Sequence, residues 1–220
     1  MSKRIFLALL VVTLAAGGAF AQIQLSAGAG GNFAVGWDSV KMSQGGFTVE
    51  SLLTTAGGGF YVFFDATYVE ADIGMLFGTQ KMKTSVGGSS AENDGPSVSF
   101  LTLSLYGKYP IDLGAVTLFP MLGIQYDIGL SAKQEVNGTI YKAESEDIPD
   151  ALNKFWIKLG VGADFNLSDA IYLRPSFLWG LNFGTKNNRD AVKTSKDTPG
   201  LDVSTFYHGL DIRVAIGFRF

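Results

Sequence analysis

Apolar and polar residues alternate with a period of two along most of this chain. From Phe206 to Phe220 the even positions are apolar except for His208, whereas most odd positions are small or charged. Such alternation is typical of β-strands whose two faces meet different surroundings. It predicts eight strands, at about residues 22–37, 52–65, 67–83, 98–109, 115–135, 154–166, 170–185 and 205–220. The fold class expected is therefore all-β, an eight-stranded antiparallel up-and-down barrel, since such barrels have an even number of strands.

The connections between these segments alternate in length. Three are short turns, at 65–67, 110–114 and 167–169. Four are long and rich in Gly, Ser, Asn and charged residues, at 38–51, 84–97, 136–153 and 186–204. In bacterial transmembrane barrels the short turns face the periplasm and the long loops face outward. We expect the same here, with any extracellular or host ligand bound through the long loops.

The bulk of the apolar faces indicates which face points outward. An eight-stranded barrel has an interior barely wide enough for side chains to fill. One face of the central strands carries residues as large as Leu118, Phe155 and Trp179, whereas the opposite face carries glycines such as Gly123 and Gly160. The large apolar residues fit only on the outside, which predicts a transmembrane barrel surrounded by lipid.

Residues 1–21 have the features of a secretory signal peptide. Lys3 and Arg4 supply the positive start, 5–16 form an apolar core, and Ala19-Phe20-Ala21 forms a small-x-small cleavage pattern. We expect export with cleavage after Ala21, which leaves 22–220 as one outer-membrane β-barrel domain.

Charge and composition exclude several classes of partner. Without Lys3 and Arg4, 15 of the 17 basic residues remain against 20 acidic ones, a formal charge of −5 that gives nucleic acid no general reason to bind. The chain contains no cysteine, so no disulfide, thiolate metal site or thiol nucleophile can form. We expect no metal and no cofactor.

The chain resembles the small bacterial outer-membrane barrels typified by OmpA, OmpX and OmpW. The resemblance rests on the signal peptide, the eight strands, the alternating connections and the ending Gly217-Phe218-Arg219-Phe220. The resemblance covers nearly the whole mature chain. It implies a location in the bacterial outer membrane, and Phe220 and Phe218 would form the C-terminal signal that the barrel-assembly machinery recognises in transient contact. We expect a monomer.

The inward face carries acidic and basic residues in equal number. A lone charge in a narrow barrel would lose its hydration, so mixed signs at similar depth should pair and form a plug. The plug is predicted from Glu70, Asp72, Asp127, Lys158, Arg174, Asp211 and Arg213. Four of them, Asp127, Lys158, Asp211 and Arg213, are expected near mid-height as the constriction. The alternative is an ion-selective ring, although such rings usually carry one sign of charge.

Some inward positions are apolar, among them Phe100, Phe119, Met121 and Leu178. They either fill space or line a chamber for a small apolar ligand. Resemblance to OmpW would imply passage of small hydrophobic molecules, with a sideways exit near Pro120, where a ladder hydrogen bond is missing.

His208 is the only histidine of the chain and is therefore the only imidazole that could act as a catalytic base. Barrel enzymes that modify lipids pair a histidine with a serine, yet the neighbouring same-face positions are Phe206 and Leu210. The sequence thus favours a non-enzymatic barrel with a narrow or sealed polar lumen and a role in envelope structure and surface contact. A channel for small hydrophobic molecules is the first alternative, and a lipid-modifying enzyme is the second.

Overall fold

The computed structural model describes residues 23–136, 139–143, 148–196 and 198–220. The expected signal peptide and its cleavage after Ala21 lie outside the described residues. Within the described part of the chain, no helix is long and apolar enough to cross a membrane.

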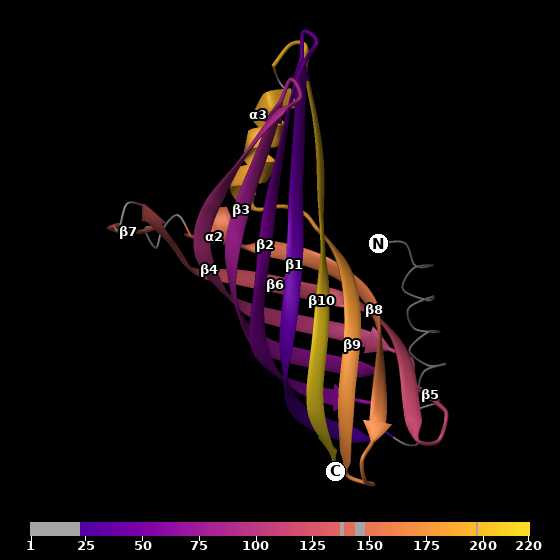
Figure 1. Cartoon of the computed structure of the whole chain (residues 1–220). Helices are drawn as coiled ribbons and strands as arrows, with labels where there is room; N and C mark the ends of the chain where they lie inside the picture. Colours follow the sequence, from indigo (N-terminus) through magenta and orange to yellow (C-terminus); the bar gives the residue numbers. More distant parts are fainter. Residues whose placement is uncertain (1–22, 137–138, 144–147, 197) are drawn as a thin grey trace, which may run out of the picture.

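Eight strands form a closed antiparallel ring (Figure 1). They are β1 (Leu25–Gln44), β2 (Phe47–Ala66), β3 (Val69–Val86), β4 (Ser89–Lys108), β6 (Val116–Val136), β8 (Lys154–Asn166), β9 (Ile171–Asn182) and β10 (Leu201–Arg219). Each strand pairs with the next in this order, and β10 pairs with β1 to close the ring. Two short strands, β5 (Ile111–Asp112) and β7 (Thr139–Lys142), form small hairpins with β6. The predicted eight-stranded up-and-down barrel is confirmed.

The connections at the lower end of Figure 1 are short, as predicted. At the upper end, the prediction of two long loops is wrong. Residues 38–51 and 84–97 instead continue the flanking strands and turn through Gly45-Gly46 and Gly87-Gly88. These glycines have φ of 57°, 86°, 56° and 89°. Positive φ at both central residues is the mark of the type I′ hairpin, and Gly-Gly is one of the pairs that favour it.

The other two expected loops also contain regular structure. The described part of 136–153 holds β7 and the short helix α2 (Ile148–Leu152), and 186–204 holds α3 (Lys186–Lys196) and the start of β10. Pro149 suits the first turn of α2, where no backbone N–H is needed. The Thr185 hydroxyl caps α3 by accepting a hydrogen bond from the backbone N–H of Asn188 at 3.3 Å.

The wall of the barrel has unequal height. β9 pairs with β10 only as far as Leu181 opposite His208, whereas β1 follows β10 up to Leu201. The upper parts of β1, β2, β3, β4 and β10 therefore rise above the short strands β8 and β9 (Figure 1). We call this part the upper projection; it comprises residues 38–44, 47–54, 79–86, 89–97 and 201–207. The helices stand at this end, α2 against β6 and α3 against β10 and α2.

The outer surface of the ring is apolar and the inner surface is charged. On β10, Ile212, Val214 and Ile216 point outward and are 48–52% exposed, while Asp211 and Arg213, at the alternate positions of the same strand, are buried. A strand of 9–11 tilted residues suffices to cross the hydrocarbon of a membrane. This arrangement is that of a transmembrane barrel, with lipid outside and paired charges inside.

Candidate functional site

Arg174 on β9 is the centre of a cluster of charges near the lower end of the lumen, which we call the lower cluster. Its Nε and Nη2 donate to the two carboxylate oxygens of Asp164 at 2.6 and 2.7 Å. The same guanidinium forms ion pairs with Asp65, at 2.7 Å, and with Glu70. Lys108 forms a further ion pair with Asp65. Carboxylates from three different strands thus meet one arginine.

Aromatic rings surround the lower cluster. The guanidinium carbon of Arg174 lies 4.8–5.0 Å from the ring centres of Phe63, Phe119 and Tyr172. Tyr172 is fully buried, and its hydroxyl is 2.7 Å from that of Ser26. Arginine stacks favourably on such rings, which also fill the space that water would occupy.

Arg213 on β10 is the centre of a second group, the middle cluster. Its Nη1 donates to Asp72 and its Nε to Asp211, both at 2.8 Å. Lys158 donates to Asp211 at 3.0 Å and to the side-chain oxygen of Gln125 at 2.7 Å. These five residues come from β3, β6, β8 and β10, so the cluster reaches across the lumen.

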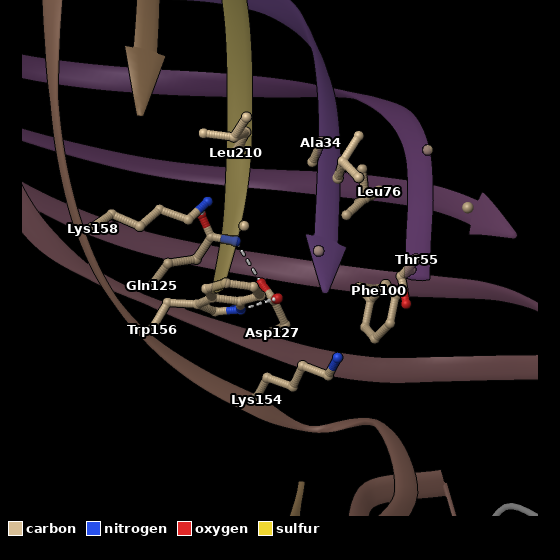
Figure 2. A pocket seen from close by; sticks show the side chains of 15 residues that line it. Ala34, Thr55, Leu76, Phe100, Gln125, Asp127, Lys154, Trp156, Lys158 and Leu210 are labelled. Atoms are coloured by element: carbon tan, nitrogen blue, oxygen red, sulfur yellow. Dashed lines mark hydrogen bonds between the residues drawn. The ribbon is translucent and has the colours of Figure 1, made fainter. Parts of the chain in front are cut away.

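Asp127 lies above the middle cluster and is joined to it through hydrogen bonds; in the part of the chain that the structure describes, it forms no ion pair. Its carboxylate accepts from Gln125 Nε2 and from Trp156 Nε1, each at 2.6 Å (Figure 2). The ammonium of Lys154 instead donates a hydrogen bond to the Asp38 carboxylate, at 2.6 Å. Of the four residues predicted as the constriction, the structure brings together Lys158, Asp211 and Arg213, and places Asp127 one layer away.

All seven residues predicted for the plug are buried, with side chains inside the barrel. Their function as a plug stays a prediction. Sequence reasoning missed Asp38, Asp65 and Lys154, which are equally buried. Asp38 was expected in a loop, although continued alternation through β1 places it on the inner face after Ala34 and Gly36.

A cavity of about 40 Å³ lies beside Asp127 (Figure 2). Phe100 and Trp156 line it together with small residues of the first three strands, Ala34, Gly36, Gly57 and Gly78. A volume of this size holds only a few water-sized groups.

The expected chamber lined by four apolar residues is not formed. Phe119, Met121 and Leu178 pack with Tyr106 in one cluster, and Phe100 belongs to another with Val98. Alternation places a residue on a face but does not give its height, and Phe100 pairs with Gly129, eight residues along β6 from Met121.

Helix α2 closes the mouth above this cavity on one side. Ile148 and Leu152 are its buried residues, and they pack against Val98 and Phe100. A side chain at Gly129 would collide with Leu152, since a Cβ there would lie 2.5 Å from the Leu152 Cβ. On the exposed side of the two helices, the Lys186 ammonium of α3 donates a hydrogen bond to the Asp150 carboxylate of α2 at 2.5 Å. Sequence reasoning missed both helices.

His208 lies outside the lumen among aromatic rings. Its ring centre is 5.1 Å from that of Trp37 and 4.7 Å from that of Phe206. Among the described residues, nothing hydrogen-bonds its buried Nδ1. No serine hydroxyl among the described residues hydrogen-bonds the ring, as a histidine base that activates a serine would require.

The other candidate positions are less informative. The ladder between β6 and β8 continues through Pro120, which pairs with Val161, so this proline marks no break in the wall. Phe218 and Phe220 are exposed, and Phe220 packs on Phe64 with ring centres 6.5 Å apart. Their function as an assembly signal stays a prediction. In the described ranges, no group of three or more acidic or histidine side chains is placed to hold a metal ion.

No protein-family model matches the chain, and no curated protein matches its sequence. Among solved structures, the chain is similar to the outer membrane protein OprG from Pseudomonas aeruginosa, with a TM-score of 0.49, 11% identity and coverage of 91% of this chain and 98% of that one. It is also similar to Neisserial surface protein A (TM-score 0.40, 8% identity, 88% and 99% covered). A third similar structure is the N-terminal β-barrel domain of Pseudomonas aeruginosa OprF (TM-score 0.39, 8% identity, 85% and 97% covered).

Proposed function

We propose that this chain is a non-enzymatic barrel of the bacterial outer membrane whose lumen is sealed to ions and which serves envelope structure and surface contact. The observation that carries the proposal is the filling of the lumen by the lower and middle clusters. Each cluster links strands on different sides of the ring through one buried arginine, Arg174 or Arg213.

Ion pairs of this kind favour a closed lumen. Arg213 is 4% exposed and reaches Asp72 on β3, Asp211 on β10 and the oxygen of Gln125 on β6. A water-filled path would have to separate these groups, and each separated charge would lack a partner in a narrow, poorly hydrated space. An eight-stranded barrel without such a path is a structural element and not a pore.

The orientation follows from the asymmetry of the two ends. The lower end carries short connections, which in outer-membrane barrels face the periplasm. The upper projection then stands outside the cell, with exposed polar residues such as Lys41, Lys81 and Glu92 on its outer face. Lipid and, transiently, the barrel-assembly machinery are the partners of the ring, and the projection is the surface for extracellular contacts.

Single-channel recording in planar bilayers tests the seal. The wild-type protein is expected to be silent, and Arg213→Ala, which removes the guanidinium of the middle cluster and leaves Lys158 as its cation, is expected to leak. Lys81→Ala serves as the matched control, because the Lys81–Glu92 pair is exposed and lies outside the lumen. Steady conductance of the wild-type protein would overturn the proposal.

A second candidate function, passage of small apolar molecules, is favoured by one observation at the upper end. The inner face of the upper projection carries Met42 and Met82, 37% and 43% exposed, above the cavity beside Phe100 and Trp156. Titration with toluene tests it, with Trp156 as the fluorescent reporter after Trp37 and Trp179 are replaced by Phe. A saturable change in Trp156 emission would support passage, and no change would remove this candidate.

A further inference from the structure

An open groove lies on the outer wall of the barrel, across the upper parts of β3, β4 and β6. Its volume is about 580 Å³, within the range of about 300–1,000 Å³ that is usual for small-molecule sites. Strand β6 supplies Lys133 to the groove and continues into the β6–β7 hairpin, which points away from the ring beside β4 (Figure 1). The side chain of Gln134 ties this hairpin to β4 by a 3.2 Å hydrogen bond to the backbone oxygen of Asp94.

The groove lies on the lipid-facing side of the wall, at the edge of the apolar surface. On β3, Thr79 shares its face with Phe77, which points outward and is 49% exposed. On β4, Ser99 follows Leu101 on the same face. Ser99 pairs with Phe77 on one side and with Ser131 of β6 on the other. The outward side chains of neighbouring strands therefore change from apolar to polar at one level.

Two shifts of strand register shape the groove. One is in the β3–β4 ladder beside Thr79, and the other is in the β4–β6 ladder beside Ser99. At the second, Leu130 is an extra residue of β6, which brings Ser131 to the outer face opposite Ser99. Strict alternation after the inward Gly129 would have turned Ser131 into the lumen. Bulges re-aim side chains in this way and are common next to active sites.

The groove offers several hydroxyls and one cation. The hydroxyl oxygens of Ser99 and Ser131 are 2.7 Å apart. Only one of the two O–H groups is used in that bond, so the other O–H and the remaining lone pairs can serve a ligand. Thr79 and Ser97, which pair with each other, add two hydroxyls, and Lys133 lies opposite Ser97. Hydroxyls that both donate and accept suit a sugar, and an ammonium suits a phosphate.

The charge of the groove is positive. Among the described residues that line it, none is acidic. The acidic residues higher on β4, Glu92 and Asp94, lie 3.7 and 3.9 Å from the ammonium of Lys81. Their charge is therefore largely offset by a lysine outside the groove, which leaves Lys133 to attract an anion.

We propose that this groove binds a phosphorylated glycolipid of the outer leaflet. Its sugar hydroxyls bond Ser97, Ser99 and Ser131, and its phosphate pairs with Lys133. An acyl chain runs down the wall over Phe77, so the site continues the surface that already faces lipid. The choice of the outer leaflet rests on the orientation given under the proposed function. A glycerophospholipid would use the lysine and the apolar wall but leave the serine hydroxyls without a sugar.

Lipid binding to the full barrel in detergent micelles tests the proposal, with native mass spectrometry to count bound lipids. The probes are monophosphoryl lipid A, a phosphorylated disaccharide with acyl chains, and phosphatidylglycerol, which carries a phosphate but no sugar. We expect monophosphoryl lipid A to bind about tenfold more tightly, the gain from a few added hydrogen bonds. Ser99→Ala combined with Ser131→Ala should remove this preference, and Lys133→Gln should weaken the binding of both lipids severalfold.

Matched controls lie elsewhere on the outer face. Ser39→Ala combined with Ser85→Ala removes two hydroxyls outside the groove, and Lys41→Gln removes an exposed lysine. Both variants should keep the wild-type affinities. Equal affinity of the wild-type protein for the two lipids would overturn the glycolipid as ligand, and equal losses in the control variants would overturn the groove as its site. Either result with silent wild-type bilayers would leave the sealed barrel standing and reject only this inference.

Discussion

Arg213 on β10 and Asp72 on β3 are 141 residues apart in the sequence, yet Nη1 of the arginine donates to the carboxylate at 2.8 Å. In the ring, β1 and β2 separate these two strands. The bond therefore crosses the lumen, and the same arginine also holds Asp211 of its own strand. One side chain ties together parts of the barrel that the backbone ladder joins only indirectly.

Arg213→Ala is expected to lower the free energy of unfolding by about 3–5 kcal/mol, the usual cost of removing one partner from a buried ion pair. The change leaves Asp72 and Asp211 in the lumen without this cation. Urea unfolding in detergent micelles measures the difference. Lys81→Ala should cost no more than about 1 kcal/mol, because the pair it breaks is exposed. Similar losses in both variants would contradict a structural function for the middle cluster.

Asp127→Asn and Asp211→Asn should differ in cost although both carboxylates are buried. Asp211 has two cationic partners, Lys158 and Arg213. Among the described residues, Asp127 accepts hydrogen bonds only from Gln125 and Trp156, and asparagine keeps one acceptor oxygen for them. We expect a loss of about 1 kcal/mol at Asp127 and of about 3 kcal/mol or more at Asp211, on the magnitudes typical of neutral and charged partners. Equal losses of unfolding free energy in the two variants would indicate that Asp127, like Asp211, belongs to the charged constriction.

Alternation predicted the faces of the barrel because the side chains of a strand point to opposite sides at every step. Asp211 and Arg213 could be placed inside, and Ile212 between them outside, from the sequence alone. The choice between a soluble and a transmembrane barrel needed one further step, namely that residues as large as Phe155 could not fit in so narrow an interior. The buried charges and exposed apolar residues of the structure agree with both steps.

The height of each side chain along the barrel axis, and the residues that it contacts, could not be predicted in the same way. The register between strands depends on turn geometry, and Gly45-Gly46 and Gly87-Gly88 were not recognised as two-residue hairpin turns. This error placed Asp38 in a loop and removed its partner Lys154 from consideration. Alternation puts both Phe100 and Phe119 on the inward face of the barrel, but it does not show that they lie at different heights along the barrel axis. Helix α2 is too short for a periodic pattern to show.

Gly217→Ala should destabilise the barrel much more than Gly31→Ala. A Cβ at Gly217 would lie 2.1 Å from the ring of Tyr172, which is fully buried against the lower cluster and has no room to move. A Cβ at Gly31 would meet nothing closer than 3.5 Å. We expect a loss of about 1–3 kcal/mol at Gly217, as for other overpacked sites, and little change at Gly31. Thermal unfolding of the two variants measures this, and equal stability would show that Tyr172 can shift.

The contact between the two helices at the mouth should depend on pH through Lys186. Its hydrogen bond and its attraction to Asp150 raise the pKa of the Lys186 ammonium above its usual range. The contact is therefore complete below the ordinary lysine pKa of about 10.4 and is lost as the pH rises through the raised value. The chemical shift of the Lys186 Cε, followed by NMR against pH, gives the midpoint.

Asp150→Asn is the control for this titration, since it removes the charge and keeps the shape of the side chain. Its midpoint should fall toward the ordinary value, and high salt should lower the wild-type midpoint in the same direction because the pair is exposed. An unchanged midpoint in Asp150→Asn would mean that Asp150 does not hold α3 over the mouth.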